Sequence, residues 1–84
     1  MYKVEFSNSA KKDLEKVNSK YLVSIASHIK SLSENPRPFG SIKLSGFEKI
    51  YRIRVGVYRI VYTIKDDILI VEVIKIDHRR NIYR

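Results

Sequence analysis

The chain has 84 residues, a formal net charge of +8 and no cysteine. This length suits one compact domain over residues 1–84, and 44% hydrophobic with 31% charged residues is typical of a globular protein. The absence of cysteine excludes disulfides, thiolate metal sites and a cysteine nucleophile. No apolar run approaches the ~18 residues of a membrane helix and the start lacks a signal-peptide core, so we expect a cytoplasmic protein.

The positive charge is unevenly distributed, because six of the seven arginines lie in the second half of the chain: Arg52, Arg54, Arg59, Arg79, Arg80 and Arg84. A polyanionic partner is the first expectation for such a domain. Arginine suits phosphate because its planar guanidinium donates two parallel hydrogen bonds and keeps its charge near neutral pH. The alternative is a basic surface that serves only solubility.

The first half predicts a strand over residues 2–7 followed by a helical hairpin. Apolar and charged side chains alternate along the strand, and Ser7 or Ser9 can then cap a helix. The Asn18-Ser19 pair ends that helix and caps a second one. The second helix carries one apolar stripe that should pack on a sheet, and it comprises Leu22, Ile25, Ile29 and Leu32.

The second half predicts an antiparallel meander. Residues 35–40, with two prolines, end the helix. Three strand-like runs follow, joined by turns at Gly56 and at Asp66-Asp67: Glu48 to Val55, Tyr58 to Lys65, and Ile68 to Ile76. The third run is apolar on both faces, which indicates a central strand. The predicted fold is therefore α+β, with the N-terminal strand and helical hairpin followed by a three-stranded meander, helices on one sheet face and the other face open.

Strand periodicity places Arg52 and Arg54 on the same face of the first meander strand. Arg59 projects to that face from the next strand if the hairpin register allows it. Three clustered cations repel one another unless something anionic spans them. That group can be a phosphate, the carboxylates of a partner, or acidic neighbours within the chain such as Glu72.

The C-terminal residues 77–84 bring the side-chain types that RNA cleavage needs. Attack of a ribose 2′-hydroxyl on its own 3′ phosphate requires a base, cationic donors for the phosphorane and an acid for the leaving oxygen. Histidine is a residue type used for acid–base catalysis, which makes His78 a candidate, and Tyr83 can stack on a base. A lone histidine in a basic tail is also a common surface residue. The scattered acidic residues and two distant histidines predict no metal site, and we expect no cofactor.

Three motifs occur in an order and spacing that resemble the RelE/ParE toxin superfamily, and the resemblance spans nearly the whole chain. They are Asn35-Pro36 with Lys43-Leu44-Ser45-Gly46, the segment from Tyr51 to Tyr62, and His78-Arg79-Arg80-Asn81-Ile82-Tyr83. The resemblance implies the toxin of a type II toxin–antitoxin pair. In the RelE-like branch such a toxin enters the ribosomal A site and cuts mRNA there without a metal, and a cognate antitoxin binds and silences it in a hetero-oligomer.

The resemblance also implies roles for individual residues. Arg52 and Arg54 match the basic residues that contact the scissile phosphate region, and Arg59 matches an arginine that stabilises the transition state. Arg79 matches a further arginine and Tyr83 a tyrosine that stacks on the substrate base. His78 completes the predicted catalytic set, with Lys43 and Arg80 as predicted substrate-binding residues.

One departure from the family pattern affects the mechanism, because some members have lysines where this chain has Arg52 and Arg54. A guanidinium is a poor proton acceptor. Either positioning and electrostatics activate the 2′-hydroxyl, or His78 shares the proton transfer. Two other functions stay open at this point: a ParE-like toxin that binds and inhibits DNA gyrase, and a non-toxic relative that only binds its antitoxin.

Overall fold

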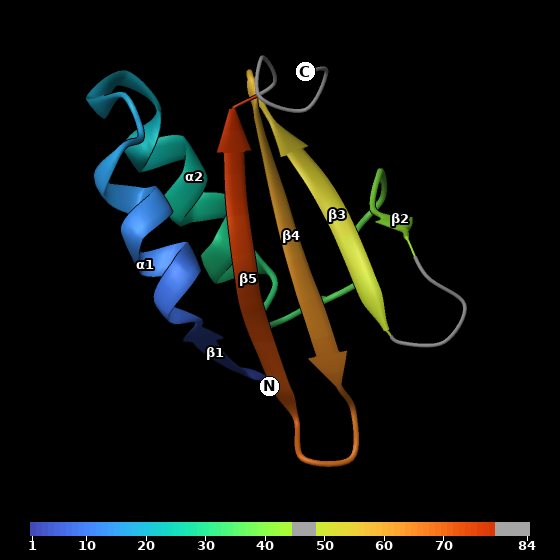
Figure 1. The fold of residues 1–84 in the computed structure, drawn as a ribbon. Helices are drawn as coiled ribbons and strands as arrows, with labels where there is room; N and C mark the ends of the chain where they lie inside the picture. The colour runs from blue at the N-terminus through green and yellow to red at the C-terminus, as the bar shows by residue number, and fades with distance from the viewer. Residues whose placement is uncertain (45–48, 79–84) are drawn as a thin grey trace.

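The computed structural model describes residues 1–44 and 49–78. Its elements are β1 (Lys3–Phe6), α1 (Asn8–Glu15), α2 (Ser19–Ser31), β2 (Ile42–Lys43), β3 (Ile50–Val55), β4 (Tyr58–Lys65) and β5 (Ile70–His78). The strands form one mixed sheet in the order β1-β5-β4-β3-β2. Both helices lie on the same side of this sheet (Figure 1). The predicted α+β class and helix placement are therefore confirmed.

The helical hairpin begins and turns at the polar residues that the sequence indicates. The Ser7 side chain accepts a hydrogen bond from the backbone N–H of Ala10 at 3.0 Å, which caps α1. The Asn18 side chain accepts from the N–H of Lys20 at 2.9 Å and caps α2. The backbone N–H of Asn18 also donates to the Tyr58 hydroxyl at 2.9 Å. This last bond ties the helical turn to the start of β4.

The core lies between α2 and the sheet. Ile25 and Ile29 of α2 and Leu32 at its C-cap are buried, as the apolar stripe predicts, and they belong to one cluster with the inward side chains of β3, β4 and β5. Leu22, the first member of the predicted stripe, is 38% exposed. Leu22 instead lines an open apolar pocket with Phe6 and Leu14, beside the core rather than inside it, so fewer side chains of the predicted stripe are buried than expected.

β5 is a central strand, as its two apolar faces predict. β1 pairs with it in parallel, from Lys3 opposite Ile70 to Phe6 opposite Val73. β4 pairs with its other edge in antiparallel register. Past the end of β1, α1 lies along the same edge of β5. There Asp13 Oδ2 accepts a hydrogen bond from the backbone N–H of Ile76 at 2.9 Å, so this part of the edge is also paired.

The predicted third run, Ile68 to Ile76, is two residues too early. β5 spans Ile70–His78, and Ile68 and Leu69 belong to the turn, where they are 56% and 48% exposed. Leu69 has a φ of 55°, a left-handed conformation that ends strand geometry. The turn therefore needs more residues than the Asp66-Asp67 pair. The two-residue β2, which pairs with β3, was not predicted.

A polar cluster closes the end of the sheet where β4 turns into β5, and we call it the Asp66 cluster: Tyr2, Arg37, Lys49, Tyr51 and Asp66. Arg37 donates to both carboxylate oxygens of Asp66 at 3.2 and 2.8 Å. The Tyr2 hydroxyl donates to Asp66 at 2.6 Å, and Lys49 Nζ donates at 2.8 Å. Hydrogen bonds from Arg37, Lys49 and Tyr2 hold the pKa of Asp66 well below its usual range.

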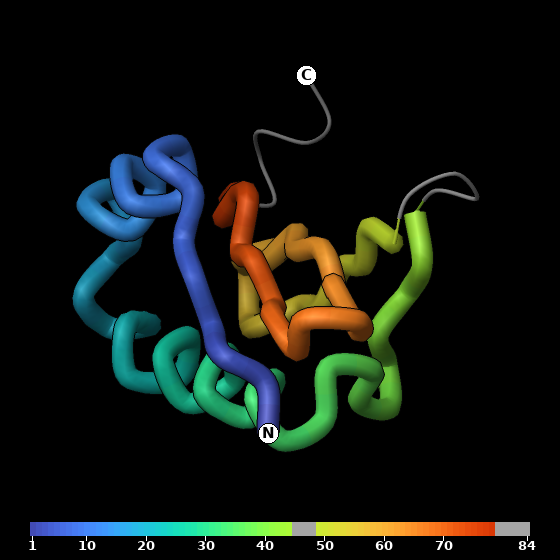
Figure 2. Tube along the Cα trace, turned by 90° about the horizontal axis from the view of Figure 1, so that it is seen from below, coloured from blue at the N-terminus to red at the C-terminus, as the bar shows by residue number. Residues whose placement is uncertain are grey.

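The same cluster holds the proline loop, residues 35–41, against the sheet. Arg37 Nε donates to the Tyr51 hydroxyl at 3.2 Å, and the guanidinium lies over the Tyr51 ring at 5.4 Å. The buried Tyr62 hydroxyl donates to the backbone carbonyl of Pro36 at 2.7 Å. Burial raises the pKa of Tyr62 to about 12. From this anchored loop the chain continues along the outer side of β3 (Figure 2).

Candidate nucleic-acid interface

Three arginines lie on the sheet face opposite the helices, and we call Arg52, Arg54 and Arg59 the arginine face. Ile53 and Val55 of β3 are buried in the core, so the pleat turns Arg52 and Arg54 the other way. Arg54 is directly opposite Arg59 in the β3–β4 register. The hairpin register therefore brings Arg59 to the other two, and neither described helix covers this face (Figure 2).

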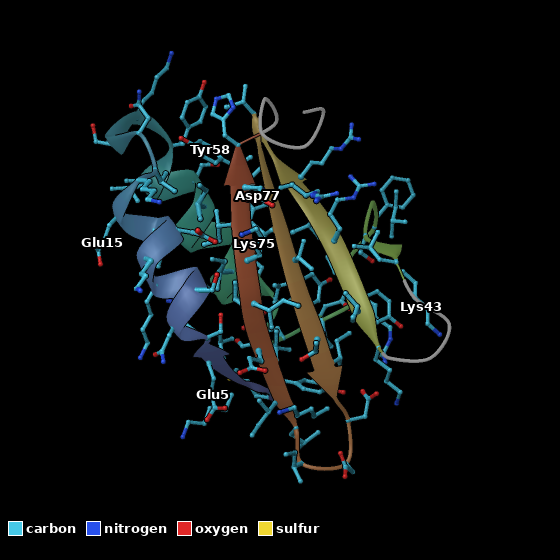
Figure 3. All side chains as sticks on the ribbon, viewed as in Figure 1. Glu5, Glu15, Lys43, Tyr58, Lys75 and Asp77 are labelled. Atoms are coloured by element: carbon cyan, nitrogen blue, oxygen red, sulfur yellow. The ribbon has the colours of Figure 1, made fainter. Side chains whose placement is uncertain are left out.

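Arg59 has weak contacts with its acidic neighbour. Its Nη2 lies 3.9 Å from Oδ2 of Asp77, beyond hydrogen-bond distance, and its side chain is 29% exposed. Asp77 also forms an ion pair with Lys75, whose Nζ lies 3.6 Å from Oδ1 of Asp77. Figure 3 shows Lys75 and Asp77 beside each other near the end of β5. Glu72, named from the sequence as a possible neighbour of the arginines, instead pairs with Lys65 at 4.0 Å.

Arg59 also carries an unsatisfied donor. Its Nε is buried and has no hydrogen-bond partner within residues 1–44 and 49–78. Such groups are uncommon in folded proteins, because a buried N–H that loses water without gaining an acceptor costs about 1–3 kcal/mol. An incoming anionic oxygen would satisfy this N–H once the side chain turns Nε toward the open face, and it would also offset the repulsion between Arg54 and Arg59.

The arginine face can bind a phosphate and stabilise charge that develops on it. Guanidinium groups pair with phosphate oxygens through two parallel hydrogen bonds, and these bonds are stronger than neutral ones. Cations held in place before the reaction stabilise a phosphorane without further reorganisation. A carboxylate of a partner protein also presents two anionic oxygens to a guanidinium and can bind the same surface.

The structure does not bring every predicted residue to this face. His78 is the last residue of β5 and pairs with Tyr58, whose side chain is in the core; the two rings lie edge to face at 5.2 Å. His78 is thus on the helix side of the sheet. Lys43 of β2 pairs with Tyr51 and so shares the Tyr51 side of the pleat. Arg79, Arg80 and Tyr83 lie outside the described residues.

Sequence reasoning missed a pocket of about 480 Å³ beside the arginine face. Its lining includes His28 of α2, Phe39 and Ile42 from the chain between α2 and β3, and Arg52 and Arg54. Phe39 is fully exposed, at 108% of its reference area. Its place between Pro38 and Gly40 was a signal, because a large aromatic residue in a turn has little core to enter.

The described part of the chain presents neither a cluster of metal-ligand side chains nor a membrane-spanning helix. Within residues 1–44 and 49–78, no three histidine, aspartate or glutamate side chains gather as metal ligands do. No helix in these ranges has the length and apolar character needed to cross a membrane.

Comparison with known proteins gives the family. The family profile described as "ParE toxin of type II toxin-antitoxin system, parDE" matches residues 4–83. Toxin RelG of Mycobacterium tuberculosis is 31% identical over 99% of this chain and 97% of its own. These matches cover nearly the whole sequence, including the strands that carry the arginine face.

Solved structures of toxin–antitoxin complexes have the same fold. The toxin–antitoxin complex RelBE2 of M. tuberculosis contains a chain that superposes with a TM-score of 0.80 at 29% identity, over 93% of this chain and 98% of that chain. The intact E. coli RelBE complex gives 0.80 at 28%, over 93% and 96%. The chain therefore belongs to the RelE/ParE superfamily of type II toxin–antitoxin toxins, and its relatives include RelE and RelG toxins.

Proposed function

We propose that this toxin is a ribosome-dependent endonuclease that cuts mRNA in the A site and so inhibits translation in the cytoplasm. The observation that carries the proposal is the arginine face, on which the buried Nε of Arg59 has no hydrogen-bond partner among the described residues. A phosphate of the bound message supplies the missing acceptor. Because Arg52, Arg54 and Arg59 come from two paired strands of a packed sheet, they are positioned before substrate arrives.

In this mechanism the 2′-hydroxyl of a nucleotide attacks its own 3′ phosphate. The O–P bond forms as the bond to the 5′ oxygen of the next nucleotide breaks; the 2′-hydroxyl proton passes to water and the leaving 5′ oxygen takes a proton from water, giving a 2′,3′-cyclic phosphate and a free 5′-hydroxyl. Arg59 donates to the phosphorane oxygens, while Arg52 and Arg54 hold the phosphate and its neighbour. Arg79 and Tyr83 are assigned here from the family motif, as a further cation and a base-stacking ring.

Proton transfer depends on electrostatics and positioning in this proposal. Arg54 stays protonated and cannot serve as an ordinary base. The β4–β5 register puts His78 beside Tyr58, on the side of the sheet away from Arg59, which argues against shared proton transfer by His78. Three cations near one phosphate favour the anionic form of the attacking oxygen. Alignment of the 2′-oxygen with the phosphate on the ribosome supplies the remaining rate enhancement.

We infer that a cognate antitoxin silences the same face in a hetero-oligomer. Related toxins have been crystallised in complex with RelB antitoxins. An acidic antitoxin segment can pair with the three arginines and occupy the phosphate position. High salt should then weaken the complex, because the pairs are partly exposed and are screened. Binding that is insensitive to salt would contradict this arrangement.

Primer-extension mapping in a translating extract tests the nuclease proposal, with wild type beside Arg59→Ala. We expect new transcript ends inside translated codons for wild type and few for the variant. The same assay on deproteinised RNA shows whether cutting needs the ribosome. Intact transcripts in an extract whose translation is blocked would overturn the proposal.

A toxin that inhibits DNA gyrase is the second candidate, because the description of the matching family profile names the ParE toxin. A gyrase inhibitor acts by protein binding and cuts no RNA. Expression without antitoxin separates the two functions. An SOS response with intact transcripts supports gyrase inhibition, whereas codon-internal ends without an SOS response support the nuclease.

A further inference from the structure

The pocket beside the arginine face has the lining of a nucleotide subsite. Its volume of about 480 Å³ lies in the range of small-ligand sites, roughly 300–1,000 Å³. Its lining includes Phe39, whose ring is fully exposed, together with Arg52 and Arg54. Phosphate-binding cations and an aromatic ring on one pocket are the two components by which proteins bind single-stranded RNA.

The loop that carries Phe39 is held at both sides of the ring. On one side Pro36 accepts the hydrogen bond from Tyr62 at 2.7 Å, and Arg37 is held by Asp66. On the other side Gly40 has a φ of +92°, and the N–H of Ser41 donates to the carbonyl of Pro38 at 3.0 Å, which closes a turn. The exposed ring therefore sits on a preorganised turn, and binding to it requires little further ordering.

His28 adds a polar group to the same pocket. Its Nδ1 lies 2.8 Å from the backbone oxygen of Ser24, and since a carbonyl can only accept, Nδ1 carries the hydrogen. In the neutral ring Nε2 is then an acceptor. It can receive a hydrogen bond from an exocyclic amino group, such as that of adenine, cytosine or guanine.

We propose that this pocket is a nucleobase subsite in which a base of the bound RNA stacks on Phe39. The inference rests on the proposed function, since the base belongs to a nucleotide whose phosphate lies on Arg52 and Arg54. These two arginines line the pocket and also form part of the arginine face, so one nucleotide can reach both. The subsite would hold the message beside the scissile phosphate and give the cut a base preference at that position.

A single tryptophan can report on the stacking, because the chain contains none. The Phe39→Trp variant is titrated with a hexanucleotide whose 2′-O-methyl groups prevent cleavage, and then with the same backbone carrying abasic sites. We expect the base-containing probe to quench the indole fluorescence and the abasic probe to leave it nearly unchanged. Val23→Trp is the matched control: Val23 is 82% exposed on α2 and does not line the pocket.

Cleavage in the translating extract provides the second readout. Phe39→Ala should lower kcat/KM on the order of tenfold, the loss of one base-stacking contact, and should flatten the base preference. Its thermal midpoint should match wild type because the ring is fully exposed. Equal quenching by both probes, or unchanged cleavage by Phe39→Ala, would overturn the subsite. Failure of wild type itself to cut mRNA would instead overturn the proposed function.

Discussion

Arg37 and Arg59 lie near opposite ends of β4 and have contrasting surroundings. Arg37 donates to both oxygens of Asp66 and to the Tyr51 hydroxyl, and its guanidinium stacks on the Tyr51 ring. Arg59 Nη2 lies 3.9 Å from Oδ2 of Asp77, and its Nε is buried without a partner in the described part of the chain. Each guanidinium nitrogen of Arg37 thus has an intramolecular hydrogen-bond partner, whereas Nε of Arg59 has none among the described residues.

We interpret the contrast as that between a structural cation and a cation with the proposed function. In the Asp66 cluster, hydrogen bonds join the residues just before β1 and β3, the proline loop, Tyr51 of β3 and the β4–β5 turn, so charge there stabilises the fold. On the arginine face, like charges stand opposite each other across the β3–β4 pair, which costs stability. Folded proteins tolerate such local cost where a ligand binds. Substitutions in the two regions should therefore have opposite effects on activity and stability.

Arg59→Ala should produce the largest effect on activity. Removal of one donor to the transition state lowers the rate of cleavage on the order of 10²–10³-fold. The free energy of unfolding should not fall, because the substitution removes a buried unpartnered N–H and the repulsion from Arg54, and the ion pair that it loses within the described residues is long. The rate of mRNA cutting in a translating extract, with urea denaturation alongside, measures both. Wild-type cleavage by a folded Arg59→Ala protein would remove Arg59 from the mechanism.

Arg37→Ala should show the reverse pattern. We expect the free energy of unfolding to fall by about 1 kcal/mol, since the lost pairs are partly exposed and screened by solvent. Cleavage by the folded protein should fall by less than tenfold. The same two assays apply, with Lys11→Ala as an exposed control on α1. A greater loss of cleavage in Arg37→Ala than in Arg59→Ala would invert the assignment of the two arginines.

Acid should weaken the Asp66 cluster. Hydrogen bonds from its partners hold the pKa of Asp66 in the folded protein below the unfolded value of about 3.9. The ionised carboxylate therefore contributes fully to the free energy of unfolding above the unfolded pKa. This contribution is lost as the pH falls through the folded pKa. The thermal midpoint of wild type should therefore drop below about pH 4. Asp66→Asn should start lower at pH 7 and lose less over the same range. If the thermal midpoints of the two proteins fall in parallel with pH, Asp66 is not the titrating group.

Arg54→Glu should produce the smallest shift in stability, in the favourable direction. A carboxylate opposite Arg59 replaces repulsion with attraction, worth roughly 0.5 kcal/mol for a cross-strand pair. The gain should shrink in 1 M salt, where exposed charges are screened. Urea denaturation at low and high salt measures it, with Arg54→Gln as the neutral control. A loss of stability in Arg54→Glu would mean that Arg54 and Arg59 do not repel in the free protein.

Much of the fold follows from short-range patterns in the sequence. Ser7 and Asn18 cap their helices through bonds within three residues, and alternation in β3 correctly sets Arg52 and Arg54 apart from Ile53. The Gly56 turn, with a φ of +60°, sets the register that joins Arg59 to them. Such features depend on local geometry, so a single sequence is enough to predict them.

The rest depends on contacts between distant residues. The parallel β1–β5 pairing joins residues more than sixty positions apart, and no local pattern specifies its register. The start of β5 shifts because Leu69 adopts a left-handed turn that favours glycine or asparagine. For the site, neither the side of the sheet that His78 takes nor the pocket at Phe39 could be predicted, because both require the placed strands and proline loop.

The central claim is that Arg59 gains a hydrogen-bond acceptor when a phosphate binds, whereas Arg37 already has acceptors within the protein. Nuclear magnetic resonance of the two guanidinium Nε–H groups, during titration with the 2′-O-methyl hexanucleotide, tests it most directly. We predict a large shift and slower hydrogen exchange for Arg59 Nε–H on adding RNA, and almost no change for Arg37 Nε–H, which already donates to Tyr51. An unchanged Arg59 signal at saturating RNA, or a larger change at Arg37, would contradict the account.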